Sequence, residues 1–552
     1  MYTLPSLLSA IAALLTLPLF LLHAQGNLGG LNGRVVDSSG AAVPGARITL
    51  KSQATNQAVT ADSSDSGFAM RGLLPGVYRL EVEKTGFKKV VRESLTILTA
   101  TQADITVTLE VGNTADSVTL ASSSIALQTS SPEVSTVLQR QTLLDLPIQI
   151  GSGASTTAAS GRRQPETFIF LTPGVVGTQW GKSINGSPEF GQEILIDGIS
   201  AQLASNPGFL AQTSPPYESI EEFKVQNTLF PAEFGRGFGV INYTMRSGTN
   251  TFHGGLFEFL RNDKLDARPF FNRTRPVVRF NEYGGNFGGP LVIPKLYNGK
   301  DRTFFNFNYS GLRNSPPLPG NLVSMPTAEF LRGDFSRHVD SAGAILPVFD
   351  PATTTPDGSR TPFPGNIIPA NRLSRVARNT TPMLPAPDLP GYFNNFLARN
   401  ANPVEDDIWS VKADHLLSAR QRLSFVVWRS LNDQFVNSVL GRASGPLGPW
   451  FLANTRGSNY RANYDFTLSP TVLIHAGYGY TKSNPTRRLD ERKGNETIQL
   501  PGIPRDNPGF PTFNINNIPL GKGGSLSRSY VIDVQFDARL SQPACNAASH
   551  CA

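Results

Sequence analysis

From Phe238 onward the chain alternates apolar and hydrophilic residues with a period of two. In residues 305–310 three aromatic side chains alternate with Asn or Ser, and similar alternation runs through residues 460–468 and 472–481. Successive side chains of a strand point to opposite faces, so each segment predicts a strand with one apolar and one hydrophilic face. The apolar face would cover a core in a soluble sandwich but would face lipid in a membrane-spanning barrel. The periodicity alone leaves both alternatives open.

Shorter alternating runs, such as residues 46–50 and 77–82, occupy residues 27–110 and are separated by turn sequences rich in Gly, Asp and Pro. Six or seven strands at this spacing predict a small β-sandwich. Stretches rich in Ser, Thr and Ala, at residues 112–128 and 151–160, have no periodicity and predict flexible connectors.

The region between the sandwich and the alternating strands is mixed. Residues 134–144 predict one or two helical turns, and residues 168–171 and 193–196 predict short strands. The second of these strands runs into Asp197 and Gly198, a turn-forming pair. Helical and extended segments together give this region an α+β character.

The chain begins with an apolar stretch, residues 7–22, that ends shortly before Ala24. A stretch of this length followed by a small residue predicts a cleaved secretory signal peptide over residues 1–24, although no Lys or Arg precedes it. A membrane anchor is the alternative, but a spanning helix needs about 20 apolar residues. No later segment reaches that length, so we expect any membrane crossing to use strands.

Composition narrows the class of protein. Charged residues make up 16% of the chain, and 51 Gly and 42 Pro accompany a hydrophobic content of 39% without any collagen-like repeat. Neither collagen nor simple disorder fits these values, whereas a strand-and-turn protein does. The net charge of +7 is spread along the chain, so we expect no nucleic-acid partner.

Motifs for catalysis and cofactor binding are missing from the sequence. There is no Walker-type phosphate loop and no Gly-x-Ser-x-Gly nucleophile motif. The histidines lie far apart, and Cys545 and Cys551 are the only cysteines, so neither a metal site nor a disulfide framework is expected. We therefore predict a non-enzymatic protein without a cofactor.

Two resemblances add to this interpretation. The string GRVVDSSGAAVPGARITL and the following GFAMRGLLPGVYRLEVEKTGFKK resemble the carboxypeptidase regulatory-like (transthyretin-like) domain, a binding or spacer module without peptidase chemistry. The strings INGSPEFGQEILIDGIS, ESIEEFKVQNTLFPAEFGRGFGVINYTMRSGTNTFHGGLFEFLRND and FGGPLVIPKLYNGKDRTFFNFNYSGLR resemble the plug and first barrel strands of TonB-dependent outer-membrane receptors, in particular the Oar-like group.

The resemblance implies a mainly β fold with a transthyretin-like β-sandwich, an α+β plug and a partial antiparallel transmembrane β-barrel. The expected organisation is a signal peptide at 1–24, a sandwich at 27–110, a linker at 111–130, a plug at 131–248 and a barrel at 249–552, with a long Pro-rich loop near 315–405.

The implied function is uptake of a large or scarce ligand, with a glycan as a candidate, through the outer membrane. The implied partners are membrane lipid and a TonB-type protein of the inner membrane, which pairs with a short extended segment of the receptor. The candidate TonB box comprises Asp116, Ser117, Val118, Thr119 and Leu120. The candidate plug residues are Asp197, Gly198, Glu221, Glu222, Glu233, Gly235 and Arg236, and the plug-to-barrel junction comprises Ser247, Gly248, Thr249 and Asn250.

The length departs from the pattern of that family. About 300 residues follow the expected plug, and about 75 of them lie in the Pro-rich loop. The remaining residues, about 230, suffice for roughly a dozen strands, against about 22 in the plugged transporters. We therefore expect a C-terminally incomplete receptor. A surface or adhesion protein without transport and a non-functional fragment remain the alternatives.

Overall fold

The structure is a computed structural model. It describes residues 27–113, 117–120, 124–125, 132–146, 162–177, 181–202, 214–230, 237–268, 270, 275, 278–315, 321–339, 343–398, 403–436, 451–469, 472–489, 499 and 535–539. The expected signal peptide, Asp116 and both cysteines lie outside the described residues.

Residues 27–109 form the predicted sandwich, and the short strands β8 and β9 extend one of its sheets; together they are named the sandwich below. Its two sheets have the strand orders β4-β1-β7 and β3-β2-β5-β6-β8. Alternate side chains, among them Leu31, Ile48 and Leu80, are buried in one shared core. The strands are β1 (Gly29–Asp37), β2 (Arg47–Ser52), β3 (Ala58–Asp62), β4 (Phe68–Leu73), β5 (Gly76–Glu83), β6 (Lys89–Ile97), β7 (Gln102–Leu109), β8 (Ser117–Leu120) and β9 (Ser124–Ile125), the last of which also pairs with β6.

The described residues from 132 to 246 form a second body, named the inner unit. Its central sheet has the order β10-β15-β16-β13-β14. The apolar face of this sheet, including Phe223 and Tyr243, is fully buried. The elements are β10 (Val134–Gln139), α2 (Arg140–Asp145), η1 (Pro165–Leu171), β11 (Val175–Gly177), β12 (Lys182–Ile184), β13 (Glu193–Ile196), β14 (Ile199–Ser200), η2 (Tyr217–Ser219), β15 (Ile220–Thr228) and β16 (Val240–Met245).

Two local predictions in the inner unit were wrong. The expected strand at 168–171 is part of the 3-10 helix η1, which starts at Pro165, a residue suited to the first position of a helix. The expected helix at 134–144 begins instead as strand β10, because β15 offers it a partner along its whole length, and only its second half becomes α2. The first error overlooked a local signal, Pro165, whereas the second arises where tertiary pairing with β15 outweighs local preference.

The alternating region folds into one antiparallel sheet, named the wall. Its order follows the sequence, β17-β18-β21-β24-β25-β26-β27-β28, and its longest strand has 19 residues. Among the described residues the two end strands each pair with one neighbour, so the sheet is open. The strands are β17 (His253–Asn262), β18 (Arg279–Pro290), β21 (Thr303–Ser315), β24 (Val404–Ser418), β25 (Gln421–Val436), β26 (Phe451–Ser469), β27 (Val472–Leu489) and β28 (Gln535–Arg539).

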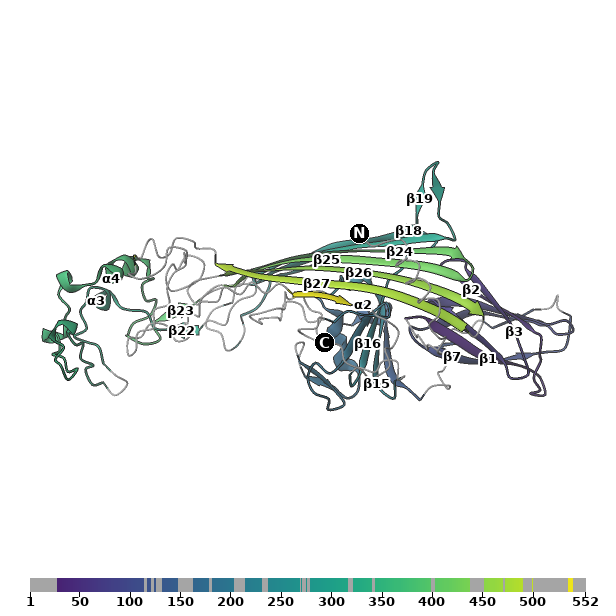
Figure 1. Cartoon of the computed structure of the whole chain (residues 1–552), viewed down its shortest axis with the longest axis horizontal. Helices are drawn as coiled ribbons and strands as arrows, with labels where there is room; N and C mark the ends of the chain where they lie inside the picture. Colours follow the sequence, from purple (N-terminus) through teal and green to yellow (C-terminus); the bar gives the residue numbers. More distant parts are fainter. Residues whose placement is uncertain are drawn as a thin grey trace, which may run out of the picture.

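The inner unit lies against one face of the wall, beneath its strands in Figure 1. On that face Asn459 and Asn463 are buried, whereas Tyr460 and Tyr478 on the opposite face are each 49% exposed. The apolar face is therefore the outer one. This arrangement is the reverse of a soluble sandwich and matches a barrel whose outer surface meets lipid.

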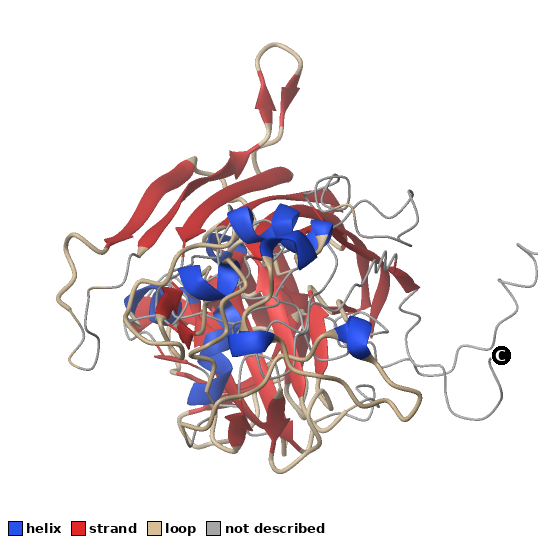
Figure 2. Cartoon of the chain, turned by 90° about the vertical axis from the view of Figure 1, so that its left-hand side faces the viewer, coloured by secondary structure: helices blue, strands red, loops and turns tan. Residues whose placement is uncertain are grey.

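The two ends of the wall differ. Short turns, including the hairpin of β19 (Val292–Ile293) and β20 (Tyr297–Asn298), lie at the end where the sandwich packs, and the long segment between β21 and β24 extends from the other end (Figures 1 and 2). The long segment contains β22 (Asn321–Val323), α3 (Ala328–Leu331), η4 (Pro351–Thr353), η5 (Pro364–Asn366), η6 (Ala370–Arg372), α4 (Arg375–Thr380), η7 (Thr381–Met383) and β23 (Phe396–Ala398).

No helix among the described residues has the length and apolarity to cross a membrane.

Candidate functional site

Asp197 and Gly198 form the turn between β13 and β14, and both have positive φ angles, 48° and 79°. Such a turn joins antiparallel strands without distorting their twist, and Asp and Gly are the residues that tolerate it. The Asp197 carboxylate is buried and forms an ion pair of 3.0 Å with Lys412 Nζ of wall strand β24. It also accepts hydrogen bonds of 3.0 Å from Met245 N and Asn27 Nδ2. The turn thus contacts the wall, the inner sheet and the start of the sandwich.

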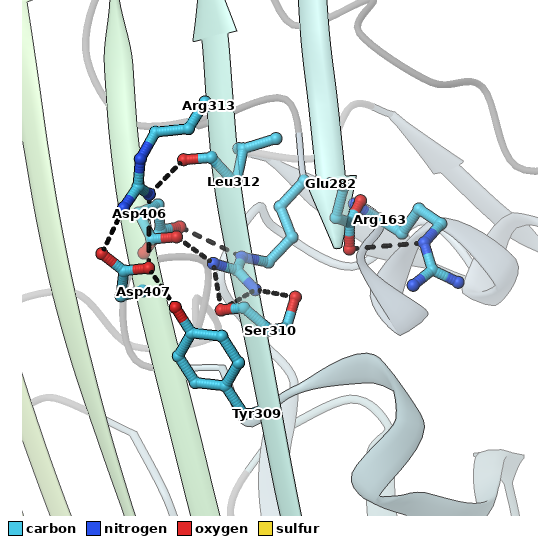
Figure 3. A network of polar contacts seen from close by, with 9 residues as sticks. Arg163, Glu282, Tyr309, Ser310, Leu312, Arg313, Asp406 and Asp407 are labelled. Carbon is cyan, nitrogen blue, oxygen red and sulfur yellow. Dashed lines mark hydrogen bonds and ion pairs between the residues drawn. The ribbon is translucent and has the colours of Figure 1, made fainter. Parts of the chain in front are cut away.

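A second link to the wall is made by Arg162, whose partners Ser310 and Asp406 are labelled in Figure 3. Its Nε lies 3.1 Å from Asp406 Oδ2, and its Nη1 donates to Ser310 Oγ at 2.6 Å. The side chains of Arg162 and Asp406 are 3% and 6% exposed. The next residue, Asp407, lies on the outer face, where it pairs with Arg313 at 3.0 Å. The two adjacent aspartates therefore form ion pairs on opposite faces of the same strand.

Arg163 makes the third link. Its guanidinium pairs with Glu218 of the inner unit and, at 3.3 Å, with Glu282 of β18. It also lies 4.0 Å from the ring centroid of Phe259, a geometry suited to a cation–π contact. Burial lowers the pKa of Arg163, but the two carboxylates more than offset this, and the net shift is upward. Arg163 remains a cation at any physiological pH.

Polar residues of β15 and β16 face the sandwich. Glu222 accepts a hydrogen bond from Thr99 N, and Lys224 Nζ donates to Ala100 O at 2.6 Å. Burial raises the pKa of Glu222 to about 7, against the hydrogen bonds from Thr99, which lower it. This carboxyl therefore titrates near neutrality. Glu221, the neighbouring candidate, points elsewhere and lies 3.8 Å from Arg246 Nε.

Residues 117–120 of the candidate TonB box form strand β8, which pairs in parallel with residues 89–92 of β6. The segment is extended, as a box must be, but it lies on the sandwich edge rather than in a free connector. Thr119 is exposed and Val118 partly buried. On its other side β8 has no neighbour within the described sheet.

The expected junction lies between β16 and β17. At Gly248 a Cβ atom would lie 2.3 Å from the carbonyl oxygen of Phe305, so this close approach requires glycine. Asn250 donates to Asp301 Oδ1 at 2.7 Å and, through its backbone N–H, to Ala54 O at 2.9 Å. The junction therefore joins a wall turn to the sandwich. Thr249 Oγ1 accepts a hydrogen bond from Thr251 N, whereas candidates Glu233, Gly235 and Arg236 lie outside the described residues.

The sequence analysis did not identify Arg162 and Arg163, nor the wall residues with which they pair. Arg162 and Asp406 lie 244 positions apart, so their spacing in the sequence could not predict their contact. The Arg162-Arg163 pair directly after a Ser/Thr/Ala-rich connector was the signal that could have marked this site. The whole arrangement is built to hold three bodies together, and no group of three metal-ligating side chains occurs in the described ranges.

Comparison with protein families identifies the wall. A family model described as outer membrane beta barrel domain matches residues 244–542, more than half of the chain. The chain belongs to this family. The match to this family places the chain in the outer membrane. A second model, the carboxypeptidase regulatory-like domain, matches residues 30–110.

A curated relative is the "TonB-dependent transporter Oar" of Myxococcus xanthus, 25% identical over 281 residues, which are 48% of this chain and 25% of the relative. The chain thus matches about a quarter of that protein's length. Similar solved structures include the siderophore receptor PirA of Pseudomonas aeruginosa (TM-score 0.36, 13% identity, 64% of this chain and 41% of that chain). The outer membrane transporter YddB of Escherichia coli is another (TM-score 0.38, 14% identity, 65% and 40%).

Proposed function

We propose that the chain acts in TonB-dependent transport across the outer membrane, with the inner unit as its plug. The observation that carries the proposal is the attachment of the inner unit to the polar face of the wall by buried ion pairs. Arg162, Arg163 and Asp197 each meet a partner of opposite charge on a wall strand. Paired charges of this kind hold a body in place, because separating a buried pair leaves each charge uncompensated.

The proposed partner is a TonB-type protein of the inner membrane. The outer membrane has no nucleotide energy source, so work must arrive through a protein contact. An open strand edge is a template for strand addition, and β8 provides such an edge at the end of the wall with short turns. Short turns face the periplasm in outer-membrane barrels, which is the side from which that partner reaches the receptor.

The proposed cargo is a large or scarce molecule, and a glycan is the candidate. The sandwich module before the plug motivates this choice. The curated relative is a TonB-dependent transporter, which supports transport as the activity.

Site-specific cross-linking tests the partner. Thr119→Cys places a thiol on exposed β8, and Thr60→Cys is its matched control, an exposed threonine on β3 at the opposite edge of the same sheet. With Cys545→Ser and Cys551→Ser as background, we expect disulfides to cysteines in the TonB-type periplasmic domain from position 119 and not from position 60. Equal yields at both positions contradict the proposal.

Deleting residues 116–120 tests transport. Cells carrying the deletion should take up a fluorescent oligosaccharide no faster than cells without the TonB-type protein, while surface binding of the same probe persists. Uptake that survives the deletion excludes this segment as the box. Surface adhesion without energised uptake in either form points to the adhesion alternative.

A further inference from the structure

Most of the turn between β6 and β7, residues 98–101, is buried although it is a loop. Thr99, Ala100 and Thr101 are 0%, 5% and 6% exposed. Loops normally run over the surface because their backbone groups need water or another partner. Here the inner unit supplies partners for Thr99 N and Ala100 O, while sandwich residues supply those for Ala100 N and Thr101 O. The turn is therefore a docking element between the two bodies.

The partners lie on one face of two paired strands. Glu222 and Lys224 are two positions apart on β15 and therefore share a face, and Thr244 of β16 is the register partner of Glu222. Thr244 Oγ1 lies 2.6 Å from Thr99 Oγ1. Lys224 Nζ lies 2.6 Å from Ala100 O and 3.4 Å from Thr101 Oγ1. Every contact joins the sandwich to the sheet of the inner unit.

The same lysine also holds the end of the linker. Glu133, just before β10, pairs with Lys224 Nζ at 2.6 Å and accepts from Gln226 Nε2 at 2.9 Å. The side chains of Lys224 and Glu133 are 0% and 3% exposed. A cation this deeply buried is costly unless all its partners stay in place. We name residues 98–101 with Glu133, Glu222, Lys224 and Thr244 the clasp.

The candidate TonB box is attached to the strand that leads into the clasp. β8 and β9 both pair in parallel with β6, at residues 89–92 and 95–96. Beyond Ile97, β6 continues directly into the clasp turn. Hydrogen-bonded strands transmit a load along their length, so a pull on β8 acts on β6 and through it on Lys224 and Glu222.

We propose that the clasp must open before the inner unit can move, and that a pull on β8 opens it through β6. The sandwich is then a release element that couples capture of the box to loosening of the plug. This inference rests on the proposed function, since it requires a partner that pulls. It assigns Lys224 and Glu222 as positioning residues and gives the sandwich a role beyond that of a spacer.

A disulfide tests the geometry. The hydroxyls of Thr99 and Thr244 are in contact, so cysteines at both positions can approach the S–S distance after small side-chain rotations. In the full chain with Cys545→Ser and Cys551→Ser, the double variant should oxidise spontaneously in outer-membrane preparations. Absence of the disulfide overturns the clasp.

Thiol labelling tests the opening. Thr244→Cys is buried beneath Thr99, so we expect a membrane-impermeant maleimide delivered to the periplasm to label it about ten-fold faster in energised cells with the TonB-type protein than in cells without it. Thr99→Cys, on the other side of the contact, should show the same increase in labelling rate. It replaces Thr244→Cys in the test if that variant fails to fold. Ser63→Cys, buried inside the sandwich, is the matched control and should label slowly in both strains.

The outcomes separate the two proposals. If position 119 cross-links to the TonB-type domain but the labelling rates at positions 244 and 99 are the same with and without that protein, the clasp is wrong and the proposed function stands. If labelling at 63 rises together with that at 244, the sandwich unfolds as a whole and the clasp is again wrong. If position 119 does not cross-link and labelling is unchanged, both proposals fall.

Discussion

The inner unit is attached to its two neighbours by different chemistry. Toward the wall it uses full charges, Arg162, Arg163 and Asp197, each facing a buried partner of opposite sign. Toward the sandwich it uses hydroxyl and main-chain groups together with Lys224 and one carboxyl, Glu222, whose pKa of about 7 lets it lose its charge. The contact with the sandwich therefore contains a carboxyl whose charge changes near neutral pH. The clasp proposal requires the contact with the sandwich, rather than the contact with the wall, to separate first.

The largest effect is expected from Arg163→Met. The change leaves Glu218 and Glu282 buried without their cation, and breaking a buried pair costs about 3–5 kcal/mol of unfolding free energy. Urea unfolding of the full chain in detergent micelles, followed by tryptophan fluorescence, measures it. Arg313→Met removes an ion pair on the outer face with 41% exposure of the arginine and should cost about 0–1 kcal/mol. Equal losses would remove the distinction between the two faces.

The pH dependence of the sandwich contact is expected to be the next largest. Burial raises the pKa of Glu222 from 4.5 to about 7, so the folded chain retains a proton that the unfolded chain has already lost between these values. The stabilisation is therefore complete below pH 4.5 and is lost as pH rises toward 7, by up to about 3 kcal/mol. Unfolding midpoints at pH 5 and pH 8 measure this fall. Glu222→Gln, which keeps the acceptor for Thr99 N, should flatten it, and an unchanged slope in that variant contradicts the assignment.

The smallest effect is expected at the turn that links all three bodies. Asp197→Asn keeps a residue that tolerates positive φ and an amide oxygen that can accept from Lys412, which also donates to Met245 O, so we expect a loss of only about 1–3 kcal/mol although the charge is removed. Asp197→Ala should cost roughly 1 kcal/mol more, because the turn then also becomes strained. The same unfolding assay compares the two variants. Equal values would show that the ion pair, and not the turn, is the whole contribution of Asp197.

Several elements could be predicted from local pattern. The runs at 46–50 and 77–82 became β2 and β5, and the Asp197-Gly198 turn lies where its residue types indicated. The segment 168–171 was misassigned because four apolar residues suit a strand or a buried 3-10 turn equally well, and only Pro165 upstream distinguishes them. The partners of Arg162 and Lys412 were unpredictable for a different reason, since a contact 244 or 215 positions away leaves no periodic trace.

The sequence by itself determined that residues such as Tyr460 and Asn459 point to opposite faces, because a strand has a period of two. It did not determine which face would be buried. Only the tertiary structure decided that, by placing the inner unit on the Asn459 side and leaving Tyr460 exposed. The physical reason is that burial depends on the partner as well as on the side chain. A polar face can be buried when charged and hydrogen-bonding groups from far along the chain arrive to satisfy it, and an apolar face can be left outward when lipid, not water, is its solvent.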